Sequence, residues 1–170
     1  MWKLRSVGSR QARDKTAESD PTSFEHALTI LSTPAHVLAA FFDPRALAEW
    51  WGVRQAVTVP RPLGVYAVDW APTDVRDELL GPLGGAFYGT IIDYRADREF
   101  FVADAYWLPP EGDPIGPMAL DVTCEASGSF AWLHVRQSGC DDSPRWRRYY
   151  RIIDEGWTES LLSLKAFLED

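Results

Sequence analysis

The sequence predicts an α+β fold in which one long C-terminal helix lies against a curved antiparallel sheet of seven strands. Near the C-terminus, apolar side chains recur at steps of three and four, which is the period of an amphipathic helix. From residue 53 onward, short alternating runs follow one another, with Gly, Pro and Asp between them. Short connections of this kind join antiparallel neighbours, so these strands should form one meander.

The C-terminal helix is expected to begin at Ser143, a good N-cap residue, because Pro144 suits the first helical position. A helix from there to Glu169 is about 39 Å long at 1.5 Å per residue, and it is not stable alone in water. One side of this helix is apolar and needs a broad partner surface, which the sheet would provide. The apolar stripe consists of Trp146, Tyr150, Ile153, Trp157, Leu161, Leu164 and Leu168.

Two short helices are predicted directly after the first strand. Residues 23–31 alternate apolar and polar side chains, the period of a half-buried strand. Thr33 and Asp43 are each followed by proline, a pair typical of a helix start. We therefore expect helices at residues 34–41 and 44–51.

The other six strands are expected to be covered on one side only. In the run from Met118 to Glu125, apolar and polar positions alternate, so one face points inward and the other outward. The six predicted strands are residues 53–59, 63–71, 86–94, 99–108, 118–125 and 130–138.

Length and charge limit the classes of partner. A chain of 170 residues is the size of one domain. Residues 1–21 lack hydrophobic periodicity and are expected to be a disordered or loosely docked tail, with a single domain at 22–170. The net charge of −8 argues against nucleic acid and anionic membranes as partners. Without a long apolar run or a signal peptide, a cytoplasmic protein is expected.

Neither a metal site nor a cofactor is predicted. His26, His36 and His134 fall on three different predicted elements, so they would have to converge by chance to bind a metal. Cys124 and Cys140 have neither a CxxC nor a zinc spacing and are expected to be unpaired thiols.

Aromatic residues make up 13 % of the chain, with eight tryptophans, which indicates a wide core or a pocket lined by flat surfaces. In residues 99–108 we expect the phase Phe101, Ala103, Ala105, Trp107 to face the helix, with Asp104 on the other side. Two alanines in the middle of a concave face leave room for a cavity between sheet and helix. Trp51 or Trp157 could instead fill that room.

The order of elements resembles the START-like, or SRPBCC, helix-grip superfamily. The segments STPAHV at 32–37, DPRALAEWWG at 43–52, LHVRQSG at 133–139 and GW at 156–157 resemble landmarks of one branch of it. That branch is the family of homologues of the activator of the heat-shock-protein-90 ATPase. The resemblance covers about residues 24–169 and implies a helix-grip fold. Single-domain relatives of the bacterial type look like binders of small molecules.

The family pattern also implies that Gln137 faces inward at the mouth of the cavity. A buried amide needs a partner, which could be a ligand, a hydroxyl such as that of Tyr149 or Tyr150, backbone or solvent. The predicted ligand-binding residues are Trp51, Tyr66, Trp70, Trp107, Gln137, Tyr150, Ile153 and Trp157.

The resulting hypothesis is a module that binds a small apolar or aromatic molecule, with no catalysis implied. One alternative is a cyclase- or aromatase-like enzyme that uses the same cavity, with Tyr150, Gln137 or, if the strand phase is wrong, Asp104. Another is a cochaperone-like protein-interaction domain. Because the family pattern turns Phe130 and Trp132 outward, a homodimer that covers them is also predicted.

Overall fold

The structure is a computed structural model that describes residues 23–139 and 141–170. The predictions made for the tail at 1–21 and for Cys140 fall outside these residues. The elements in chain order are β1 (Ser23–Ile30), α1 (Pro34–Ala39), α2 (Pro44–Trp51), β2 (Gln55–Thr58), β3 (Val65–Trp70), β4 (Arg76–Asp77), β5 (Gly81–Pro82), β6 (Gly85–Arg95), β7 (Glu99–Leu108), β8 (Ile115–Ser127), β9 (Phe130–Gly139) and α3 (Pro144–Glu169).

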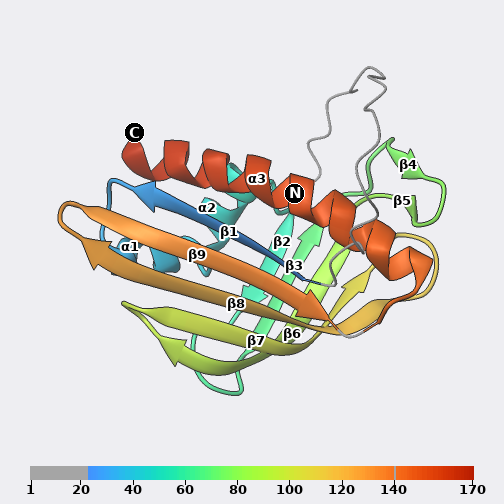
Figure 1. Ribbon diagram of the computed structural model, residues 1–170, viewed down its shortest axis with the longest axis horizontal. Coiled ribbons are helices and arrows are strands. Elements are labelled where there is room, and N and C mark those ends of the chain that lie inside the picture. Colours follow the sequence, from blue (N-terminus) through green and yellow to red (C-terminus); the bar gives the residue numbers. More distant parts are fainter. Residues whose placement is uncertain (1–22, 140) are drawn as a thin grey trace, which may run out of the picture.

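Seven of these strands form one antiparallel sheet in the order β1-β9-β8-β7-β6-β3-β2. Figure 1 shows the sheet curving beneath α3, which runs across its open side. The predicted helix-grip arrangement is confirmed, including the two short helices after the first strand. Two short strands that the sequence pattern did not predict, β4 and β5, form a separate small hairpin between β3 and β6.

The helices begin where their capping residues predict. Thr33 Oγ1 accepts a hydrogen bond from the backbone N–H of His36 at 3.3 Å, and Asp43 Oδ1 accepts one from Arg45 at 2.8 Å. α2 ends at Gly52, whose φ of 69° is the left-handed conformation that glycine adopts readily. Each of the three helices, including α3 after Ser143 and Pro144, therefore begins at a position determined by residues next to it in the sequence.

The inward phase predicted for β7 is half wrong. Ala105 and Trp107 are fully buried, as expected, but Phe101 and Ala103 are only half-buried and lie on the other face. In the first half of β7, the side chains that point into the interior are those of Phe100 and Val102.

A β-bulge causes the difference. The pairing of β7 with β8 shifts register between Val102 and Ala105, and Asp104 has a φ of 50°. The extra residue reverses which face the following side chains occupy. Opposite the bulge, Gly89 allows a close approach, because a Cβ there would lie 2.6 Å from Val102 Cγ1 and 2.9 Å from Ala105 Cβ.

Polar contacts fix α3 to the edge strand β1, from the middle of the helix to its C-terminal end. His26 Nε2 lies 2.7 Å from Asp154 Oδ1. Lys165 Nζ donates to the carbonyl of Thr29 at 2.6 Å, and Glu169 Oε1 accepts from the N–H of Leu31 at 2.8 Å. Lys165 and Glu169 thus bond to backbone groups at the end of β1 and just after it. These groups would otherwise be open to pairing with another strand.

The β4–β5 hairpin is fixed to the N-terminal half of α3. The carboxylate of Asp77, whose side chain is 6 % exposed, accepts hydrogen bonds from the N–H groups of Leu79 and Leu80 and from Arg148 Nε at 2.7 Å. At its base, the carbonyl of Gly84 accepts a hydrogen bond from Trp107 Nε1 at 2.8 Å. The hairpin is thus held by one ion pair to the helix and one hydrogen bond to the sheet.

We predict that Asp77 makes stability depend on pH. Burial by itself raises the pKa of Asp77, but the hydrogen bonds from Arg148, Leu79 and Leu80 outweigh it and lower this pKa below its ordinary value. A group whose pKa is lower in the folded state stabilises above its unfolded pKa, about 4 for Asp, and loses this contribution as pH falls through the folded pKa.

Asp77→Asn should therefore lose about 1 kcal/mol of unfolding free energy at pH 7, because the charged hydrogen bond to Arg148 disappears. The difference in unfolding free energy between the variant and the wild type should become smaller as pH falls below about 4. Urea unfolding between pH 7 and pH 3 measures this gap. Asp74→Asn, an exposed carboxylate beside the same hairpin, is the control and should leave no such gap. A gap for Asp77→Asn that is constant with pH would contradict the assignment.

Candidate functional site

Three tryptophans from three elements meet between the sheet and α3. The ring of Trp51, at the end of α2, lies 5.1 Å from that of Trp70 on β3 and 4.9 Å from that of Trp157 on α3, measured between centroids. Trp50 also stacks on Trp51, with ring centroids 4.9 Å apart and an interplanar angle of 6°. Trp70 Nε1 donates to the backbone carbonyl of Trp51 at 3.1 Å, which fixes the end of α2 against β3.

The buried amide of Gln137 is the polar centre of this layer. Its Oε1 accepts a hydrogen bond from Trp157 Nε1 at 3.0 Å. Its Nε2 donates to the hydroxyl of Tyr149 at 3.2 Å and lies 2.9 Å from the sulfur of Met118. Gln137 faces inward as the family pattern implied, and its partners are protein side chains from α3 and β8. The desolvation of the amide is therefore largely compensated within the protein.

A narrow void lies next to this amide. It is a packing gap in which no position admits a water molecule. Apart from Gln137, its walls are apolar, so the void is expected to stay dry. It is lined by Trp51, Trp70, Phe87, Leu120, Gln137 and Trp157.

Four of the eight predicted site residues line the void: Trp51, Trp70, Gln137 and Trp157. The other four are buried in the surrounding packing and do not line it. Tyr66 donates its hydroxyl hydrogen to the carbonyl of Phe41 at 3.0 Å. Trp107 stacks on Tyr149 at 5.1 Å, Tyr150 packs against the ring of Phe24 at 5.8 Å, and Ile153 is fully buried.

Two wall residues, Phe87 and Leu120, were not among the predicted ones. Both lie on the inward phase of their strands, so the alternation of β6 and β8 was the signal that could have found them. The space is smaller than a cavity formed by two alanines would be, because the bulge turns Ala103 outward and leaves only Ala105 inside. The rings of Trp51 and Trp157 fill most of the remaining room.

Among the described residues, the groups considered for catalysis are not brought together as an acid–base pair. Asp104, the carboxylate considered for an enzyme, is exposed on the bulge of β7. Burial raises the pKa of the Tyr66 and Tyr149 hydroxyls far above the ordinary value, so both stay protonated. The thiol of Cys124 is buried and free, and burial, helped by the charge of Glu125, raises its pKa to about 11.

Within residues 23–139 and 141–170, no cluster of His, Cys, Asp and Glu has the arrangement of a metal site. None of the helices in this part of the chain is long and apolar enough to cross a bilayer.

Comparisons with known proteins identify the fold. No protein-family model matches the sequence, and no curated protein matches it. Among solved structures, protein CV1439 from Chromobacterium violaceum has a TM-score of 0.66 and 21 % identity, over 88 % of this chain and 99 % of that one.

Two further structures carry names of the predicted branch. The AHSA1 protein from Silicibacter pomeroyi has a TM-score of 0.62 at 18 % identity, and the Aha1 dimer from Colwellia psychrerythraea has 0.60 at 14 %. Each match covers 86 % of this chain and 96 % of the other. At these identities the likeness shows a shared helix-grip fold, as the sequence resemblance implied, and leaves function to the residues of the site.

We predict that the Gln137–Trp157 hydrogen bond contributes to stability as a coupled pair. Gln137→Leu should lower the unfolding free energy by about 1–3 kcal/mol, because it leaves the indole N–H of Trp157 and the hydroxyl of Tyr149 buried without this partner. Trp157→Phe removes the donor and some packing. A double-mutant cycle followed by urea unfolding should show that the second substitution has a smaller effect when the first is present. Strictly additive effects would contradict the coupling.

Proposed function

We propose that this chain binds a small, flat, apolar or aromatic molecule between the sheet and α3. The observation that supports this proposal is the dry void, whose walls include the rings of Trp51, Trp70 and Trp157. Flat apolar walls with one polar group are typical of sites for small ring-containing ligands.

Gln137 would orient the ligand. The amide oxygen has two lone pairs, and the indole of Trp157 occupies one of them. A ligand with a single N–H or O–H donor on an otherwise apolar ring would match the second. Such a ligand would leave the hydrogen bonds to Trp157 and Tyr149 in place.

Binding would require movement of the tryptophan layer, because the void of this closed form does not admit even water. The part that would move is the indole of Trp51, which contacts both Trp70 and Trp157, while its backbone carbonyl stays bonded to Trp70 Nε1. Its displacement would join the volume of one indole to the void. The apparent affinity would then be reduced by the fraction of molecules in the open form.

We predict that indole binds to this site and that indene, the isostere without an N–H, binds more weakly by about 1 kcal/mol or more. Isothermal titration measures both affinities, and native mass spectrometry of the purified protein would detect a molecule that is already bound. Leu120→Phe adds volume inside the void and should weaken indole binding. Leu162→Phe, the same change at a position that is 61 % exposed, is the control and should not. If indole does not bind, or binds equally to the Leu120→Phe protein, the proposed site is wrong.

We also propose that the chain forms a homodimer through the outer face of β9. Phe130 and Trp132 are 44 % and 48 % exposed, and Leu31, which follows β1, is 51 % exposed. Trp132 lies opposite Thr29 of β1, so these side chains occupy one end of the sheet. Adjacent exposed side chains of this size mark contact surfaces, and a twofold pairing covers each patch with its own copy. A structural neighbour whose name describes a dimer is compatible with this arrangement.

Sedimentation of the wild type and of Trp132→Ser tests the dimer. The wild type should sediment as a dimer, and the variant should sediment as a monomer with nearly unchanged stability, because an exposed ring contributes little to the core. Val57→Ser, which also removes an exposed apolar side chain but lies on the opposite edge strand β2, should leave the dimer intact. A monomeric wild type contradicts the proposal.

A further inference from the structure

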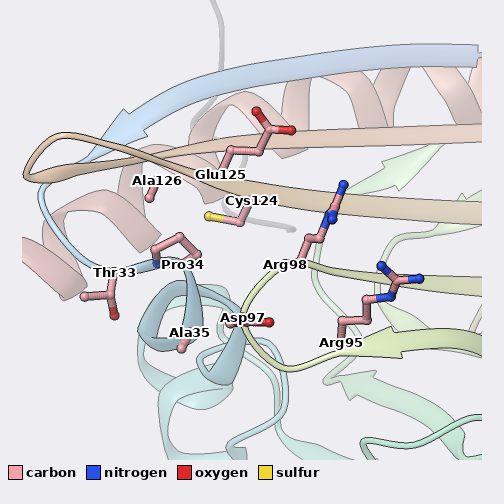
Figure 2. Close-up of a pocket in the computed structure, with 9 residues that line it drawn as sticks. All are labelled: Thr33, Pro34, Ala35, Arg95, Asp97, Arg98, Cys124, Glu125 and Ala126. Atoms are coloured by element: carbon pink, nitrogen blue, oxygen red, sulfur yellow. The ribbon is translucent and has the colours of Figure 1, made fainter.

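A second space, separate from the void, opens at one end of the sheet. Figure 2 shows three segments around it: residues 33–35 at the start of α1, residues 95–98 at the turn between β6 and β7, and residues 124–126 near the end of β8. The groove has a volume of about 650 Å³ and shares no lining residue with the void near Gln137. This volume falls within the range of about 300–1,000 Å³ that is typical of small-molecule sites.

Backbone hydrogen bonds hold the frame of the groove. The N–H of Cys124 donates to the carbonyl of Arg98 at 2.7 Å, and the N–H of Arg98 donates to the carbonyl of Arg95 at 3.0 Å. On the opposite side, Thr33 Oγ1 caps α1. The turn that carries the two arginines is thus fixed to β8, so the groove exists before any ligand binds.

Small, uncharged side chains form one wall of the groove. Pro34 and Ala35 come from α1 and Ala126 from β8, and Figure 2 shows the thiol of Cys124 directed toward them. Burial raises the pKa of this thiol to about 11, so it is neutral. This wall therefore offers an apolar surface on which a few carbon atoms can lie.

Two guanidinium groups lie on the other side of the groove. In Figure 2 the side chains of Arg95 and Arg98 extend to the same side, away from α1. Arg95 Nε is 3.5 Å from Glu99 Oε1, whereas Arg98 forms no salt bridge with any other described residue. In a chain with a net charge of −8, an arginine left in this state beside a preformed groove is available to an anion.

The acidic residues of the groove restrict the kind of anion. Asp97 and Glu125 also line it, so the four charged side chains sum to zero. A polyanion such as a nucleotide phosphate would be repelled by the two carboxylates. A single carboxylate carries less charge and is repelled less, and the planar guanidinium of Arg98 can bind it through two parallel hydrogen bonds.

We propose that this groove binds a small monocarboxylate. Its carboxylate pairs with Arg98, with Arg95 beside it, and its apolar part lies against Pro34, Ala35 and Ala126. The site is independent of the void beneath α3, so it would be present whether or not that void accepts a ligand.

Benzoate is the probe, with benzamide as the uncharged isostere, and both are titrated against the wild type by ¹H–¹⁵N correlation spectroscopy. Benzoate should shift the amide signals of Ala35, Arg98 and Ala126 and leave the indole signal of Trp157 unchanged. Arg98→Gln should weaken benzoate binding about tenfold, the effect of one charge-assisted pair. Arg61→Gln removes an exposed arginine in the loop between β2 and β3 and should leave the affinity unchanged.

The proposal is overturned if benzamide binds as tightly as benzoate, because the guanidinium then recognises no charge. It is also overturned if Arg98→Gln binds benzoate like the wild type, or if only the signals around Trp157 move. Since Arg98 is exposed, the variant should fold, and its unchanged spectrum outside the groove is the check.

Discussion

The burial of one apolar stripe of α3 against the concave side of the sheet is the interaction on which this structure depends. A helix of this length is not stable alone, and a sheet with one apolar face needs a cover. Each large side chain of the stripe contributes roughly 1.5–3 kcal/mol when it is buried. Polar contacts then fix the position of the helix, through Arg148 at one end and Lys165 and Glu169 at the other.

The same burial explains why the interior is nearly full. Aromatic rings provide much apolar area. Trp50 and Trp51 stack on each other at the end of α2, and Trp51 packs against Trp157 of α3. Rings are rigid, however, and they leave small gaps where their shapes do not match. The void beside Gln137 is such a gap, and its one polar wall residue already has partners in Trp157 and Tyr149. Stability and room for a ligand compete for the same volume.

The fold itself says little about what the chain does, because likeness to solved structures at 14–21 % identity shows a shared architecture alone. Function has to be sought in particular side chains. The void is apolar, central and too narrow for water, whereas the groove at the β6–β7 turn is charged, open and peripheral. Molecules suited to one would not suit the other, so the two spaces can be tested separately.

By itself, the sequence determined the helices, the strands that alternate over many residues and the side of α3 that is buried, because these signals are local. The caps at Thr33, Asp43 and Ser143 each act within three residues. Only the tertiary structure decided the rest. The bulge at Asp104 arises from pairing with neighbouring strands, and the β4–β5 hairpin is too short to show a period. Whether two alanines and eight tryptophans leave a cavity depends on how rings from α2, α3 and the sheet meet, and residues far apart in the chain decide that contact.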